Sequence, residues 1–120
     1  MAEKVDRLTR VNELLKRELA EAIERGLISA PGVLVSVTEV HASVDLRNAT
    51  VYISIFGADS ARKHKIMREL NEQRLDFQHR LARVLAFKHT PVLDFRLDMR
   101  TELGDRVLEL LNEEDSNRDA

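Results

Sequence analysis

The sequence contains no cysteine, and only 4% of its residues are aromatic. Without cysteine, disulfides, thiol catalysis and cysteine–zinc sites are excluded. No apolar run approaches the ~20 residues that a membrane-spanning helix needs. The opening MAEKVDRLTR has no apolar segment, so we do not expect it to be a secretory signal. These features fit a cytoplasmic protein with no membrane partner.

Signatures of cofactor binding and catalysis are also missing. The scattered glycines allow neither GxGxxG nor a P-loop: they are Gly26, Gly32, Gly57 and Gly104. The histidines form no HxxxH pair, so we expect surface or helix-cap roles for His41, His64, His79 and His89. Asp94 and Asp98 share a strand face but stand ~13 Å apart, too far for a direct acid–base pair. We therefore expect no enzyme, no cofactor and no metal; a small acid–base enzyme is a distant third alternative.

What the chain does have is charge, unevenly placed. Its 120 residues predict one domain, and 33% of them are charged. The net charge is -2 over residues 1–61, +5 over residues 62–89 and -5 over residues 90–120. This asymmetry predicts a surface facing a polyanion beside an acidic tail. The alternative is that the charges are only the solvated sides of helices.

The first half of the chain predicts a helix and a strand pair. Apolar residues recur at helical spacing from Val5 to Arg25, and Gly26 is the expected stop. Residues 33–40 and 48–56 predict strands, and the connection is too short for a helical crossover. The pair should therefore be antiparallel.

Residues 60–87 predict a helix with Ser60 as its N-cap. Unbroken, it would be about 40 Å long, longer than the strands it covers. It would also place Leu75 opposite the apolar stripe. We therefore expect a break near residues 73–75. The predicted stripe consists of Ile66, Leu70, Phe77, Leu81 and Val84.

Residues 90–99 predict the last strand. Its inward residues should be Leu93, Phe95, Leu97 and Met99, and its outward residues Asp94, Arg96 and Asp98. A short helix over residues 101–111 should complete a domain of residues 1–112, followed by a disordered acidic tail over residues 113–120. The predicted fold class is α+β, in the order α-β-β-α-(break)-α-β, with a three-stranded sheet covered by helices on one face.

The helical region carries the most informative polar residues. On a helical wheel Lys65, Arg68, His79 and Arg83 lie away from the apolar stripe, and Arg80 lies at its flank. Arginine and lysine so placed neutralise phosphates. Glu72 and Asp76 interrupt the patch, and the few aromatics exclude a broad base-stacking platform. Binding should therefore depend on the nucleic-acid backbone and shape.

Three stretches make the chain resemble ribosome-binding factor A, a family with the type II KH-like fold. They are VTEVHASVDLRNATVY at residues 37–52, RLTRV at 7–11 and TPVLDFRLD at 90–98. The resemblance implies a non-catalytic factor that binds 16S ribosomal RNA on the 30S subunit during maturation and supports growth in the cold. The chain departs from the family at its Ala-x-Gly kink, where Gln73-Arg74-Leu75 stands instead.

The leading hypothesis is therefore an RNA-binding assembly factor of the small ribosomal subunit, acting as a monomer. The candidate RNA-binding residues are Arg74, Arg80, Arg83, Lys88, Lys65 and Arg68, with Arg7 and Arg10 as a weaker group. Arg7 and Arg10 are equally placed to pair with Asp6 or Glu13. The alternative is a protein-interaction module of the same fold without RNA binding.

Overall fold

The computed structural model describes residues 2–86 and 88–100, and its elements follow the predicted order. The elements are α1 (Ala2–Glu24), β1 (Leu34–Ala42), β2 (Asn48–Phe56), α2 (Ser60–Glu72), α3 (Arg74–Val84) and β3 (Val92–Leu97). The helix predicted over residues 101–111 and the predicted acidic tail lie outside the described residues.

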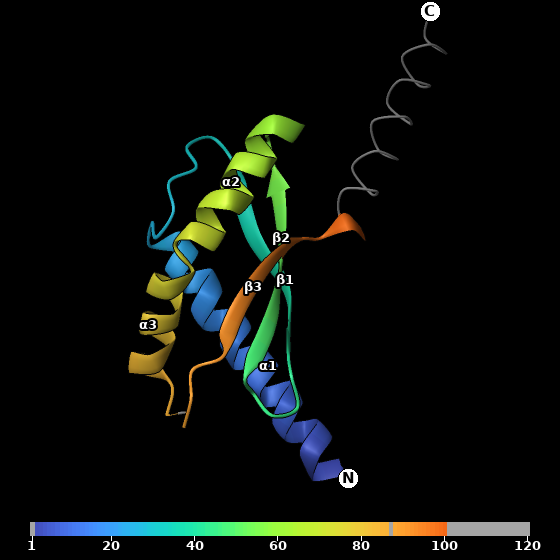
Figure 1. The fold of residues 1–120 in the computed structure, drawn as a ribbon. Coiled ribbons are helices and arrows are strands. Elements are labelled where there is room, and N and C mark those ends of the chain that lie inside the picture. Colours follow the sequence, from blue (N-terminus) through green and yellow to red (C-terminus); the bar gives the residue numbers. More distant parts are fainter. Residues whose placement is uncertain (1, 87, 101–120) are drawn as a thin grey trace, which may run out of the picture.

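The three strands form one sheet in the order β1-β2-β3. β1 and β2 pair antiparallel as predicted, and β3 lies parallel to β2. A parallel neighbour requires a crossover, which α2 and α3 supply. Figure 1 shows α1 crossing behind the strands, α3 beside the C-terminal half of α1, and α2 above α3 along the upper part of the sheet. The predicted α+β fold, with helices on one face of the sheet, is confirmed.

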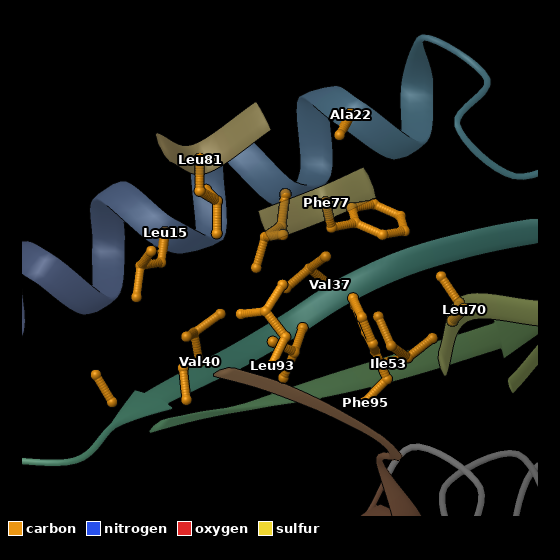
Figure 2. Close-up of a cluster of buried hydrophobic side chains, with 14 of the residues drawn as sticks. Leu15, Ala22, Val37, Val40, Ile53, Leu70, Phe77, Leu81, Leu93 and Phe95 are labelled. Carbon is orange, nitrogen blue, oxygen red and sulfur yellow. The ribbon is translucent and has the colours of Figure 1, made fainter. Parts of the chain in front are cut away.

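The hydrophobic core lies between the helices and this face of the sheet (Figure 2). Leu15 comes from α1 and Phe77 from α3, and both are fully buried. They face Ile53 on β2 and Leu93 on β3, which are also fully buried. The core therefore fixes each helix by its apolar stripe and turns the opposite, polar side outward.

A β-bulge at Thr38 keeps the apolar residues of β1 on the core face. Val37 pairs with Ile53 and Glu39 with Tyr52, so Thr38 has no partner across the strand pair. Residues three apart would otherwise point to opposite faces of a strand. Because of the extra residue, Val37 and Val40 are both buried.

α1 ends as predicted at Gly26. The Gly26 N–H donates to the Ile23 carbonyl at 3.0 Å, and the Leu27 N–H to the Ala22 carbonyl at 3.1 Å. This is the Schellman pattern, which needs a left-handed residue at the position of Gly26. Its φ is +89°.

The predicted helix break is confirmed at Gln73. The Gln73 N–H donates to the Glu69 carbonyl at 3.0 Å and so closes α2, while its carbonyl accepts from the Phe77 N–H at 3.2 Å and starts α3. Its φ of -93° and ψ of 13° lie in a region that residues other than glycine can adopt. The break thus forms without glycine.

Two details of this helical region were predicted wrongly. The N-cap is Asp59 rather than Ser60, because the Asp59 side chain accepts from the Arg62 N–H at 2.8 Å. Val84, expected in the apolar stripe, is 52% exposed because α3 ends there. Leu75 is also exposed, so the break does not bring it into the core.

β3 is shorter than predicted, and this reverses one further expectation. The strand ends at Leu97, so the alternation of faces stops there. Met99, expected inside, is 60% exposed. Asp98 lies on the outward face as predicted, but it is buried there by Thr38 and Arg100. Within the described part of the chain, no helix combines the length and apolarity that a membrane span requires.

Candidate nucleic-acid interface

The outer sides of α2 and α3 carry a group of exposed cationic side chains. Ile66 and Leu70 anchor α2 in the core, and Phe77 and Leu81 anchor α3. The helical period then sets the polar residues between them outward. We call the exposed cations of this region the basic band, which consists of Lys65, Arg68, Arg74, Arg83 and Lys88.

Six arginines elsewhere in the described chain lie beside a carboxylate, whereas Arg7, Arg10 and Arg62 do not among the described residues. Arg25 lies 2.7 Å from Glu21, and Arg96 lies 2.8 Å from Asp94. The arginines with a carboxylate within 4.0 Å are Arg17, Arg25, Arg47, Arg80, Arg96 and Arg100. Among the described residues, no member of the basic band has such a partner. The band therefore presents charge that is free to meet an external anion.

The basic band is interrupted by carboxylates, as the sequence predicted. Glu72 and Asp76 are exposed on the same two helices. Neither forms an ion pair with the band in the part of the chain that the structure describes. Their charge lowers the local positive potential without occupying the guanidinium donors.

Arg80 differs from the other predicted RNA-binding residues. Its side chain is only 21% exposed and packs toward α1, where its Nη2 lies 3.8 Å from Oε2 of Glu21. Its Nε is buried without a hydrogen-bond acceptor among the described residues. The sequence placed Arg80 at the flank of the stripe, but it could not show that α1 covers this flank.

Arg7 and Arg10, the weaker predicted group, are exposed on the N-terminal half of α1. This half of α1 lies at the opposite end of the molecule from α2 (Figure 1). Neither residue forms an ion pair with Glu13 in the described structure. The structure therefore does not join them to the α2 part of the basic band.

The kink between α2 and α3 exposes two neighbouring residues. Arg74 and Leu75 both lie on the surface in the first turn of α3. Leu75 stands where the family glycine was expected, and it has a helical backbone. This turn therefore presents the Leu75 side chain beside the Arg74 guanidinium, where a glycine would leave the backbone bare.

The open face of the sheet carries a second polar cluster, centred on Asp98. Its carboxylate accepts from the Thr38 hydroxyl at 2.7 Å and from Nε of Arg100 at 3.3 Å. Nη2 of Arg100 also donates to Oε2 of Glu39 at 2.8 Å. Donors from Arg100, and then from Thr38, lower the pKa of Asp98, while His41 and Arg100 lower that of Glu39.

This cluster stabilises the structure and is not arranged for acid–base chemistry. A general acid or base is tuned toward neutral pH, whereas these carboxyl pKa values move away from it. Asp98 and Glu39 also raise the pKa of Arg100. Among the described residues, no three His, Asp or Glu side chains are grouped to hold a metal ion.

The motif at residues 43–48 builds the turn between β1 and β2. The Ser43 hydroxyl donates to Oδ1 of Asp45 at 2.7 Å, and the same oxygen accepts from the Arg47 N–H at 3.2 Å. Leu46 has a φ of +59°. The Ser43 hydroxyl and the Arg47 N–H lower the pKa of Asp45. These residues shape a loop, and the charged surface is built elsewhere.

Sequence reasoning missed one neighbouring feature, a groove between the C-terminal end of α1 and α3. Its volume is 790 Å³, and its charged lining residues are Arg25, Asp76, Arg80 and Arg83. The only sequence signal was the four-residue spacing of Glu21 and Arg25, which is typical of a helical ion pair.

Comparison with known proteins gives a consistent result. The family model described as ribosome-binding factor A matches residues 7–111. A protein named ribosome-binding factor A from Gloeobacter violaceus is 37% identical over 113 residues, covering 92% of this chain and 87% of the relative. One of the same name from Caldicellulosiruptor bescii is 33% identical, with coverage of 90% and 83%.

Solved structures agree with the sequence matches. The crystal structure of ribosome-binding factor A from Thermus thermophilus superimposes with a TM-score of 0.64 at 26% identity, covering 75% of this chain and 94% of that one. A homology model of the Thermus thermophilus factor, fitted into a cryo-EM map of a 30S complex, gives a TM-score of 0.60 at 28% identity, with coverage of 71% and 88%.

Proposed function

This chain belongs to the ribosome-binding factor A family, and we propose that it binds the small ribosomal subunit through 16S ribosomal RNA during subunit maturation. In this proposal the protein holds an RNA conformation without catalysing a reaction, and it acts as a cytoplasmic monomer. A role in growth in the cold follows from the same hypothesis. The Thermus thermophilus relative fitted into a map of a 30S complex supports the choice of subunit.

One observation carries the RNA-binding part of the proposal: the basic band has no carboxylate partners among the described residues. Other exposed cations of the described chain do lie beside a carboxylate, as Arg96 does beside Asp94. Unpaired arginine and lysine side chains bind phosphates and release the counterions that surround RNA. The band is therefore suited to an RNA backbone.

The proposal is tested by co-sedimentation of the purified protein with isolated ribosomal subunits at low and moderate salt. Selective, salt-sensitive pelleting with the small subunit is the expected result. Each phosphate contact to a single strand gives a log–log salt slope of about -0.7. Binding that is nearly independent of salt would favour the alternative, a protein-interaction module of the same fold.

A matched pair of double variants then assigns the binding to the basic band. Replacing Arg68 and Arg74 with Gln removes two unpaired charges, and replacing Arg47 and Arg96 with Gln removes two paired ones. Both changes lower the net charge equally. We expect the first double variant to lose about tenfold or more in affinity and the second to stay near wild type. Equal losses would mean that only overall charge matters.

A further inference from the structure

The groove between α1 and α3 combines small lining residues with concentrated positive charge. Ala22 and Gly26 line it from α1 and the turn that follows, and Ala82 lines it from α3. Its charged lining residues are three arginines, Arg25, Arg80 and Arg83, and one carboxylate, Asp76, which forms no ion pair among the described residues. A volume of 790 Å³ leaves room for a phosphate group and the adjoining nucleotide.

The charge inside the groove is incompletely balanced. Glu21 is the carboxylate within 4.0 Å of Arg80, at 3.8 Å, but it binds Arg25 more closely, at 2.7 Å. One carboxylate thus serves two guanidinium groups. Arg80 is also largely removed from water, and its buried Nε has no acceptor among the described residues. A desolvated cation with a loose partner is costly, and an added anion would offset that cost.

We propose that this groove binds a phosphate of the RNA backbone between Arg80 and Arg25, and that Glu21 is an internal competitor for the same donors. This inference rests on the proposed function and adds a second contact, apart from the α2 part of the basic band. The planar guanidinium fork matches two phosphate oxygens. In the free protein the Glu21 carboxylate occupies these donors in place of phosphate and so limits affinity.

The competitor role predicts that removal of one particular carboxylate strengthens binding. Glu21→Gln keeps the side-chain shape, removes the charge and releases both arginines. The matched control is Glu24→Gln, an exposed residue of the same helix end that forms no ion pair among the described residues. We expect Glu21→Gln to raise the affinity for isolated small subunits about threefold to tenfold above that control.

A second pair of variants tests Arg80 as a hydrogen-bond donor to phosphate. Arg80→Met keeps an unbranched apolar stem and should lower affinity about tenfold, with the salt slope reduced by about 0.7. Arg47→Met, which removes a paired surface charge, is its control. Combining Glu21→Gln with Arg80→Met should cancel most of the gain from Glu21→Gln, because the two changes act on one site.

The outcomes separate the groove from the proposed function. If wild-type protein pellets with small subunits but Glu21→Gln and Glu24→Gln bind them with equal affinity, the groove proposal is overturned and the proposed function is not. Wild-type protein that does not pellet overturns the proposed function together with this inference. The charged groups of poly(U) are phosphates. If the variants rank in the same order of affinity for poly(U) as for subunits, a phosphate ligand is supported. If they show this order only with subunits, a phosphate ligand is overturned. If thermal unfolding shows that Arg80→Met is misfolded, the Glu21 and Glu24 comparison decides.

Discussion

The side-chain amide of Asn71 on α2 binds both backbone groups of Phe95 on β3. Its Nδ2 donates to the Phe95 carbonyl at 3.4 Å, and its Oδ1 accepts from the Phe95 N–H at 3.3 Å. Oε1 of Gln78 accepts from the Leu93 N–H at 3.2 Å in the same way. β3 is an edge of the sheet, and unpaired edge groups invite pairing with other chains. The two side-chain amides therefore satisfy backbone groups of β3 that a further strand would otherwise bind.

Replacing Asn71 with Ala should destabilise the protein by about 1 to 3 kcal/mol, because two backbone groups beside the core lose their partner. Urea unfolding measures the change. Glu72→Ala, at the exposed neighbouring position, is the control and should stay within about 0.5 kcal/mol of wild type. An Asn71→Ala variant as stable as wild type would show that water replaces the amide without cost.

Two glycines with similar backbone angles should respond differently to alanine. Gly57 has a φ of +86°, and an added Cβ would lie 3.3 Å from the Gly32 carbonyl oxygen. Gly26 has a φ of +89°, and a Cβ there would meet no atom within 4 Å. Both substitutions cost about 1 to 2 kcal/mol for the left-handed backbone.

Only Gly57→Ala also crowds a backbone atom. We therefore expect it to lower the free energy of unfolding more than Gly26→Ala, and equilibrium unfolding in urea would detect the difference. The opposite ranking would show that the loop around Gly32 shifts easily and that the Schellman turn at Gly26 is the stricter position.

Introducing a glycine at the kink should weaken the fold. Leu75 is 61% exposed and lies in the first turn of α3, so Leu75→Gly loses little burial but gains backbone freedom in the unfolded chain. We expect a loss of about 0.5 to 1 kcal/mol. Leu75→Ala is the control and should be nearly neutral by thermal unfolding. A stabilising Leu75→Gly would mean that the backbone there is strained.

The sequence was informative wherever a regular pattern extended over several turns or strand residues. The helical stripe of Ile66, Leu70, Phe77 and Leu81 is buried as predicted, and the opposite phase correctly predicted exposed cations. The break near Gln73 was predicted from length, because a longer rod would overhang the strands. One supporting argument was wrong, since Leu75 stays exposed after the break.

Features that depend on contacts between distant segments were not predicted. The burial of Arg80 follows from the packing of α3 against α1, which no local pattern encodes. Asp98 is buried on the open face of the sheet because Thr38, sixty residues earlier, lies at the bulge of β1 and donates its hydroxyl to the carboxylate. In the same way, the groove required the end of one helix and the flank of another, so only its Glu21 and Arg25 pair could be anticipated.

The pKa of Asp98 gives a prediction for stability against pH. Hydrogen bonds from Arg100, then from the Thr38 hydroxyl, lower this pKa in the folded protein. The ionised form therefore stabilises the fold. The contribution is fully present above the ordinary aspartate pKa of about 3.9 and is lost as the pH falls through the lower, folded value.

Asp98→Asn should destabilise the protein at pH 7, and the difference from wild type should shrink as the pH falls below about 4. Urea unfolding at pH 7, 5 and 3 measures this. Asp94→Asn removes a carboxylate from an exposed pair with Arg96 and should change stability by less than about 1 kcal/mol throughout. If the Asp98→Asn difference were instead constant down to pH 3, its cost would come from shape and hydrogen-bond geometry. The charge of Asp98 would then contribute nothing to the stability of its contact with Thr38, which joins the end of β3 to β1.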